Sequence, residues 1–325
     1  MPLANRAAMS IEDLGKDYNG SPAVRGIDLE VGRGEFFGLL GPNGAGKTTT
    51  MAMLTGLMEP TRGRIRVEGV SLSSKPLEVK AMIGFVPQEF AFYPTLHAVD
   101  NLRFFGRLYG LRRARLNERI REVLHAVGLE DRARQTVATF SNGMMRRLNI
   151  AIGLLHEPRV LILDEPTVGM DAHSRNAVYE TLARLNREGV TILYSTHHME
   201  EAQRLCGRVA IMDQGRILTV DTPEALVRRH GRGLVRIELK EPAGDGLHQE
   251  MAALEGVEEA AGRDGIWTLT TREPEKTVRL LMARTESRGV RFRSLSILEP
   301  NLESVFLRLT GRGLRDSPGP ERREA

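Results

Sequence analysis

The chain has 325 residues, of which 41% are hydrophobic and 27% are charged, and this length is enough for one large and one small globular domain. No stretch approaches the roughly 18 consecutive apolar residues of a membrane span, and the first residues lack the apolar core of a signal peptide. The one cysteine, Cys206, excludes an internal disulfide and is typical of a reducing cytoplasm, while the net charge of +4 leaves nucleic acid, anionic lipid and protein open as partners.

Two strands are predicted near the N-terminus, over residues 10–18 and 23–31, joined by the turn Asn19-Gly20-Ser21-Pro22. Tyr18 ends the first of them. Its ring could stack on an adenine base, a contact worth ~1–3 kcal/mol, or it could be a surface tyrosine of an edge strand. Taken alone, the residue favours neither role.

The next stretch fits the phosphate-binding pattern G-x-x-x-x-G-K-[ST]. It follows a short apolar strand at residues 35–40 and precedes a helix predicted over residues 47–58. Glycines let the backbone wrap a polyphosphate, while the N–H groups and the helix dipole attract negative charge. Lys47 is expected to reach the β- and γ-phosphates, and the Thr48 hydroxyl to coordinate Mg2+. The motif consists of Gly41, Pro42, Asn43, Gly44, Ala45, Gly46, Lys47 and Thr48.

Gln88 follows a strand predicted over residues 81–87. A glutamine at a strand end can reach a metal ion or an attacking water, although such a residue is more often solvated in a loop. Residues 95–157 then show helical periodicity, with seven arginines and a single acid between positions 103 and 121. These arginines could face lipid headgroups or a partner protein, or they could form a solvated helix face.

A loop at Phe140 leads into a helix predicted to end near His156. Ser141 is a good N-cap residue, and Gly143 leaves the backbone open. The start of this helix is either a second anion site or a simple capped helix, and the residues alone favour the capped helix.

Two adjacent carboxylates follow a buried strand predicted over residues 160–163. Asp164 is suited to holding Mg2+, and Glu165 is suited to orienting and deprotonating a water. Asp171 follows on a loop. His197 stands at the tip of the strand predicted over residues 190–194, where it could contact a γ-phosphate or be an ordinary satisfied polar residue.

The rest of the chain has two parts. A hairpin through Asp213-Gln214-Gly215 is expected to close the sheet. Residues 229–310 then alternate three strands with three helices, and residues 311–325 are predicted to be a disordered tail. The strands are predicted at residues 234–239, 265–271 and 290–297, and the helices at residues 246–254, 274–288 and 301–310.

Residues 8–228 resemble the nucleotide-binding cassette of ABC transporters, because these motifs occur in that family's order and approximate spacing. The resemblance implies an α/β fold: a P-loop ABC-type cassette with a helical subdomain inserted at about residues 89–157, followed by a small α/β appendage at residues 229–310. ATP and Mg2+ are the implied cofactors. The resemblance implies catalytic roles for Glu165, His197 and Gln88, and metal ligation by Thr48, Gln88 and Asp164. It implies nucleotide binding by Tyr18, Gly41 to Thr48, Thr49, Ser141, Asn142, Gly143 and Asp171.

The sequences of these motifs are similar to those of the drug, lipid and polysaccharide exporter branch of the family, which includes daunorubicin-resistance-type ATPases. In the family two cassettes dimerise head to tail, so Ser141 and Gly143 would contact the ATP of the opposite cassette. One departure concerns the signature stretch, usually Leu-Ser-Gly-Gly-Gln, because Asn142 replaces its first glycine here. Asparagine tolerates a left-handed backbone better than most residues, so we predict that the stretch still binds phosphate.

We therefore expect an ATP-hydrolysing subunit of an exporter, peripheral to the cytoplasmic face of the membrane. Its expected partners are a second copy of the cassette and an integral membrane permease, with no nucleic acid. The alternative is a soluble ABC-type ATPase that acts on ribosomes or DNA. A small-molecule kinase is disfavoured, because it needs neither the stretch at Ser141 nor His197.

Overall fold

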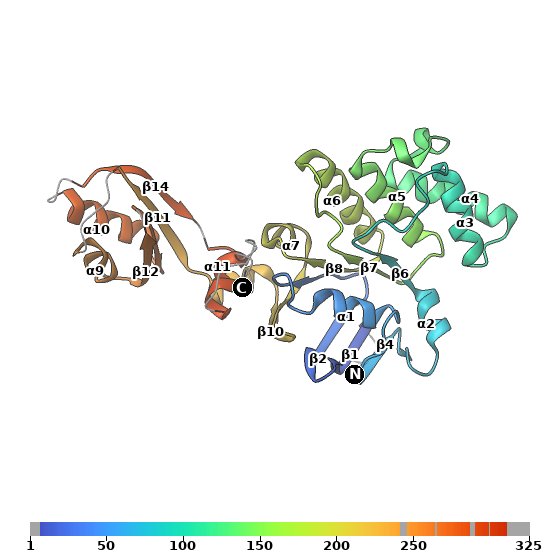
Figure 1. Ribbon diagram of the computed structural model, residues 1–325, viewed down its shortest axis with the longest axis horizontal. Helices are drawn as coiled ribbons and strands as arrows, with labels where there is room; N and C mark the ends of the chain where they lie inside the picture. Colours follow the sequence, from blue (N-terminus) through green and yellow to red (C-terminus); the bar gives the residue numbers. More distant parts are fainter. Residues whose placement is uncertain (1–6, 241–245, 264, 287–289, 299, 311–325) are drawn as a thin grey trace, which may run out of the picture. The chain divides into compact units, whose positions relative to one another are not determined.

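The computed structural model describes residues 7–240, 246–263, 265–286, 290–298 and 300–310 (Figure 1). The chain forms two compact units, Met1–Thr222 and Pro223–Ala325. The expected boundary at residue 228 lies inside helix α8 (Pro223–His230) of the second unit. The expected tail, residues 311–325, lies outside the described part of the chain.

A six-stranded sheet in the order β10-β9-β3-β8-β7-β6 is the centre of the first unit. All neighbouring strands are parallel except the β9–β10 hairpin, which was predicted from its turn. Strands β3, β7 and β8 are buried along their whole length, as is usual for a parallel sheet covered on both faces. The bounds are β3 (Phe36–Leu40), β6 (Ile83–Val86), β7 (Val160–Asp164), β8 (Thr191–Thr196), β9 (Arg208–Asp213) and β10 (Arg216–Asp221).

A second, antiparallel sheet in the order β2-β1-β4-β5 belongs to the same unit. Its N-terminal hairpin turns through Asn19 and Gly20, which have positive φ values of 51° and 86°. Side chains from both sheets and from helix α1 form one apolar core. The bounds are β1 (Ala7–Tyr18), β2 (Ser21–Gly32), β4 (Arg62–Val67), β5 (Val70–Ser71) and α1 (Lys47–Leu54).

Helix α1 is one turn shorter than the sequence predicted. It ends at Leu54 rather than near Met58, because Gly56 adopts φ 66° two residues later, a left-handed conformation typical of helix ends. Among the described residues, no helix is both long and apolar enough to cross a membrane. The other helices of this unit are α2 (Pro76–Met82), α3 (Ala98–Leu108), α4 (Arg113–Val127), α5 (Asn142–Leu154), α6 (Ala172–Arg187) and α7 (Met199–Leu205).

The second unit contains a four-stranded antiparallel sheet in the order β12-β13-β11-β14. The sequence analysis missed one strand, β12, which pairs with β13 as a hairpin. Trp267, the single tryptophan of the chain, packs against the apolar core of this unit. The bounds are β11 (Gly233–Leu239), α9 (Gly246–Ala252), β12 (Val257–Arg263), β13 (Ile266–Thr271), α10 (Pro274–Glu286), β14 (Phe292–Leu298) and α11 (Leu302–Thr310).

Candidate functional site

The parallel register brings the predicted motifs to one edge of the six-stranded sheet. Leu40 at the end of β3 pairs with Thr196 of β8, and Asp164 at the end of β7 pairs with Ser195. The segments that follow β3, β6, β7 and β8 carry Lys47 at the start of α1, Gln88, Glu165 and His197, respectively. Ligands of open α/β sheets bind at the carboxyl ends of the strands, so this edge is the expected site.

Two glycines of the phosphate loop are required by the backbone. Gly46 caps α1 with φ 105°, which other residues rarely adopt, and a Cβ there would lie 2.8 Å from the Ala23 carbonyl oxygen. A Cβ on Gly41 would lie 2.2 Å from the Met212 carbonyl oxygen. The loop therefore folds back on Lys47, whose ammonium group donates hydrogen bonds to the carbonyls of Gly41 and Pro42 at 2.8 and 3.1 Å.

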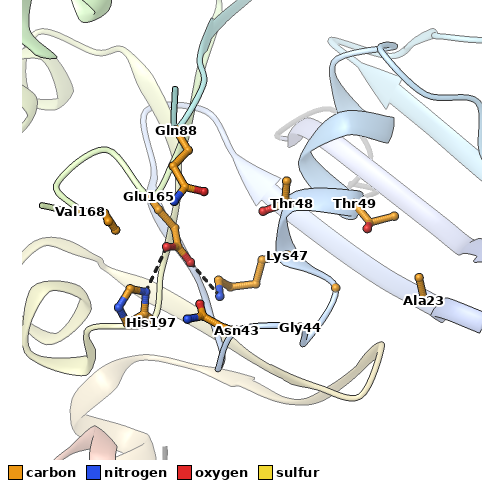
Figure 2. Close-up of a pocket in the computed structure, with 11 residues that line it drawn as sticks. Ala23, Asn43, Gly44, Lys47, Thr48, Thr49, Gln88, Glu165, Val168 and His197 are labelled. Carbon is orange, nitrogen blue, oxygen red and sulfur yellow. Dashed lines mark hydrogen bonds and ion pairs between the residues drawn. The ribbon is translucent and has the colours of Figure 1, made fainter. Parts of the chain in front are cut away.

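Lys47, Glu165 and His197 form a buried chain of polar contacts (Figure 2). Lys47 Nζ lies 3.0 Å from Glu165 Oε1, and His197 Nδ1 lies 3.1 Å from Glu165 Oε2. The Lys47 and Glu165 side chains are only 4% and 7% exposed, so the two charges stabilise each other out of water. Both carboxylate oxygens of Glu165 are thus held in defined directions.

These side chains line a cavity of about 410 Å3, within the ~300–1,000 Å3 typical of small-molecule sites. Thr48 and Gln88 open onto the same cavity (Figure 2), and the oxygens of hydroxyl and amide groups are ligands that suit Mg2+. The lining residues are Ala23, Asn43, Gly44, Gly46, Lys47, Thr48, Thr49, Gln88, Glu165, Val168 and His197.

Asp164, at the end of β7, precedes Glu165 and is not among the residues that line this cavity. Its Oδ1 accepts a hydrogen bond of 2.6 Å from the Ser195 hydroxyl, whose oxygen in turn accepts the Glu165 N–H at 3.0 Å. Glu165 has φ 44°, a left-handed conformation that costs a non-glycine residue about 1–3 kcal/mol. Ser195 therefore fixes both neighbouring acids, and the sequence analysis did not single it out.

Other predicted residues lie outside the cavity lining. Tyr18 is 44% exposed at the end of β1, and its hydroxyl lies 3.0 Å from the Met58 sulfur. Asp171 caps helix α6 by accepting the Ser174 N–H at 2.9 Å, and hydrogen bonds from Ser174 lower the pKa of its carboxyl group. Asp171 therefore caps a helix and does not line the cavity that contains Lys47.

The signature stretch starts helix α5. Ser141 accepts the Met144 N–H at 3.3 Å, so the capped helix is confirmed. Asn142 is the first residue of α5 and is not among the described residues with positive φ, so the left-handed backbone that we invoked for it is not needed. Gly143 is required by packing, since a Cβ there would lie 2.6 Å from Ser174 Cβ.

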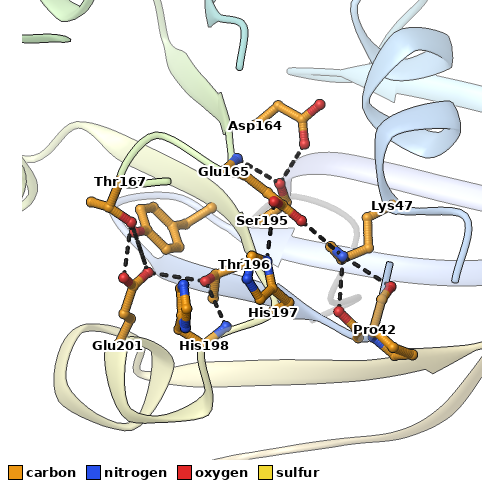
Figure 3. Close-up of polar contacts among 12 residues, drawn as sticks. Pro42, Lys47, Asp164, Glu165, Thr167, Ser195, Thr196, His197, His198 and Glu201 are labelled. Carbon is orange, nitrogen blue, oxygen red and sulfur yellow. Dashed lines mark hydrogen bonds and ion pairs between the residues drawn. The ribbon is translucent and has the colours of Figure 1, made fainter. Parts of the chain in front are cut away.

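Glu201 was missed by the sequence analysis. This buried carboxylate of α7 accepts hydrogen bonds from the hydroxyls of Thr167 and Thr196 (Figure 3), at 2.9–3.0 Å, and from Tyr194 at 2.7 Å. Burial raises the pKa of Tyr194 well above its usual value, and the neighbouring carboxylate raises it further. Thr167 follows Glu165 by two residues and Thr196 precedes His197, so Glu201 joins the two segments that carry these groups. No spacing in the sequence marks such scattered hydroxyls.

Comparison with known proteins agrees with this geometry. Residues 24–168 match the sequence model of the family described as ABC transporter. The linearmycin resistance ATP-binding protein LnrL of Bacillus subtilis is 41% identical over 316 residues, which span 95% of this chain and all of LnrL. The chain belongs to the ATP-binding proteins of ABC transporters. Members of this family bind and hydrolyse ATP, and this ABC ATPase does the same.

Two further relatives and one solved structure extend the comparison. The Nod factor export ATP-binding protein I of Ralstonia nicotianae is 37% identical, over 97% of each chain. The daunorubicin resistance ATP-binding protein DrrA3 of Streptomyces coeruleorubidus is 36% identical, over 94% of this chain and 96% of its own. A solved ATP-binding subunit of an ABC transporter aligns with a TM-score of 0.62 at 32% identity, over 68% of this chain and 92% of its own. The predicted family, exporter branch and fold class are confirmed.

Proposed function

We propose that this ABC ATPase is the ATP-hydrolysing subunit of an exporter and that it acts with a separate membrane permease at the cytoplasmic face of the membrane. The names of its relatives, which include Nod factor export and resistance to linearmycin and daunorubicin, support an export role. The observation that carries the catalytic part is the buried contact of Lys47 and His197 with the two oxygens of Glu165, in one cavity.

Glu165 is the group that would activate water. Its carboxylate is held from both sides, so it can accept a water proton while the water attacks the γ-phosphate in line. When ATP enters, its phosphates would take over the Lys47 ammonium group and free one Glu165 oxygen for this water. Mg2+, held by Thr48, Gln88 and Asp164, would neutralise the phosphate oxygens. His197 would donate to the γ-phosphate while its Nδ1 contacts Glu165 at 3.1 Å.

The second half of the ATP site would come from another copy of the chain. Ser141 and Asn142 are exposed, and neither lines the cavity that holds Lys47. The N-terminus of α5 offers free N–H groups and a positive dipole end to an incoming phosphate. We therefore assign Ser141, Asn142 and Gly143 to the ATP of the partner copy, with Tyr18 stacking on adenine and Asp171 at the interface. All residues that line the cavity lie between positions 23 and 197, so we assign ATP binding to residues 8–228, with about 89–157 as the helical subdomain, and an accessory role to residues 229–310.

The test uses Glu165→Gln, which keeps the size of the side chain and removes the base. We expect ATP binding without turnover, and an ATP-dependent dimer in size-exclusion chromatography. Affinity purification of the same variant from membranes should recover an integral membrane protein. If ribosomes or DNA are recovered in its place, the soluble alternative is correct. Turnover within a few-fold of wild type would show that another residue activates water.

A further inference from the structure

Arg146 is a buried cation that the ATP site described above does not use. It lies in helix α5, five residues after Ser141, and is 3% exposed. Its Nη1 and Nη2 donate hydrogen bonds to the carbonyl oxygens of Pro87 and Gln88 at 2.8 and 2.7 Å. Its guanidinium carbon lies 4.7 Å from the centre of the Phe90 ring. Burial lowers the pKa of Arg146 to about 10, which leaves the group charged at neutral pH.

The neighbouring arginine offers a comparison within the same helix. Arg147 also donates to two consecutive carbonyls, those of Val127 and Gly128, at 3.0 and 3.1 Å. Those carbonyls belong to the end of α4, which carries none of the predicted ATP-site residues. Arg147 donates both hydrogen bonds from Nη1, whereas Arg146 uses its two terminal nitrogens, and of the two only Arg146 reaches the segment that carries Gln88.

The backbone carbonyl and the side chain of Gln88 have different surroundings. Its side chain lines the ATP cavity beside Glu165, while its carbonyl is fixed by Arg146. The same residue also lines a second cavity, of about 470 Å3, together with Asn142, Phe90 and Arg146. The two hydrogen bonds of Arg146 therefore connect helix α5 to the segment that carries Gln88.

We propose that Arg146 is a positioning residue, which holds the Gln88 amide in the ATP cavity and couples its position to that of Ser141 at the start of α5. This inference rests on the proposed function, because the proposed function assigns Gln88 and Ser141 to the ATP site. A guanidinium group suits the task, since its planar fork can donate to two carbonyls at once, whereas lysine provides a compact point charge.

The experiment compares Arg146→Lys with Arg147→Lys in the full-length chain, each measured for ATP affinity, turnover number and the Mg2+ concentration that gives half-maximal turnover. For Arg146→Lys we expect turnover to fall about 10-fold or more, because small displacements of a positioning group cost up to ~100-fold. The Mg2+ requirement should rise, while ATP affinity stays within about twofold. Arg147→Lys should change turnover by less than about twofold, in line with a substitution away from the site.

A double-mutant cycle with Gln88→Ala separates positioning from general damage. If Arg146 acts through Gln88, Arg146→Lys should cause little further loss of turnover once Gln88→Ala is present, because coupled residues are non-additive. Phe90→Leu, which removes the ring beneath the guanidinium and leaves its hydrogen bonds, provides a milder variant and should give a smaller loss of the same kind.

Three outcomes would contradict the proposal, and they distinguish a failure of the role of Gln88 from a failure of the role of Arg146. If Gln88→Ala turns over like wild type, the proposed role of Gln88 fails. If Gln88→Ala is impaired but Arg146→Lys reduces turnover by the same factor with and without it, Arg146 does not act through Gln88. If Arg146→Lys and Arg147→Lys lose turnover to the same extent, and ATP affinity to the same extent, then Arg146 has only a packing role.

Discussion

The six-stranded sheet of the cassette and the four-stranded sheet of the C-terminal unit differ in how they bury their residues. Strands β7 and β8 are buried at every position, whereas β11 alternates between buried and less buried positions. A parallel sheet covered on both faces leaves its strand ends as the place where polar groups can gather. An antiparallel sheet with one covered face needs no such edge.

The buried polar residues follow the same division. Lys47, Arg146, Asp164, Glu165 and Glu201 of the cassette are all buried and charged. In the described part of the C-terminal unit the buried polar residues are mainly hydroxyls, such as the Thr271–Thr277 pair at 2.7 Å, with Arg232 as the one buried charge. Because burying a charge is expensive, this concentration of charges marks the edge where function lies. The four predictions below test this contrast, from the largest expected effect to the smallest.

Lys47→Met removes the cation of the phosphate loop and keeps an unbranched side chain that is one atom shorter. ATP affinity should fall by about 100-fold or more, because losing one partner of a buried charged contact costs about 2–5 kcal/mol. Equilibrium binding of a fluorescent ATP analogue measures the loss. Lys276→Met is the matched control in the other unit, where the ammonium group pairs with Glu255 at 2.7 Å. An equal loss of affinity in both variants would remove the contrast between the units.

Glu201→Ala removes the acceptor of three hydroxyl groups. The free energy of unfolding should fall by about 3 kcal/mol, since each unsatisfied buried polar group costs about 1–3 kcal/mol. Turnover should fall about 10-fold because His197 and the segment after Glu165 lose a shared anchor. Urea unfolding and steady-state ATPase assays measure both. The exposed neighbour provides the control: Glu200→Ala should change stability by less than about 0.5 kcal/mol. If the two variants are equally stable, Glu201 is not an anchor.

A fragment of residues 1–222 should fold and bind ATP with an affinity within about threefold of the full chain, because a compact unit with its own core can fold alone. Circular dichroism and ATP binding check this prediction. An insoluble fragment without nucleotide affinity would show that the two units depend on each other.

Asn142→Gly should have the smallest effect, a change in turnover of less than about threefold. Asn142 is exposed at the start of α5 with an ordinary backbone, and glycine there costs at most about 1 kcal/mol of helix stability. Steady-state ATPase assays of the purified chain measure it. A large gain in turnover would mean that asparagine impairs the site, and that the natural partner is a different cassette.

The sequence was sufficient to predict the elements that depend on a local pattern of residues. Apolar runs such as residues 160–163 predicted the buried strands, and the glycine spacing around Lys47 predicted the phosphate loop. Strand β12 was missed because Val257–Arg263 has neither alternation nor β-branched residues beyond its first position, and its pairing with β13 determines its conformation.

The supporting contacts of the site could not be predicted. Ser195, Glu201 and Arg146 act through partners 31, 34 and 58 residues away in the chain. Only the folded chain brings them together with these partners, because no local spacing in the sequence links residues that lie so far apart. Gln88 was identified by its place after strand β6, whereas Arg146, which donates to its carbonyl, lies on helix α5.

The location of Trp267 makes the C-terminal unit optically distinct. It is the only tryptophan, and it packs against the core of that unit, so fluorescence excited selectively at its indole originates there alone. Far-ultraviolet circular dichroism, by contrast, is dominated by the larger unit with its longer helices. Comparing the two signals during one denaturant titration would show whether the units unfold together or in succession, without a label or a mutation.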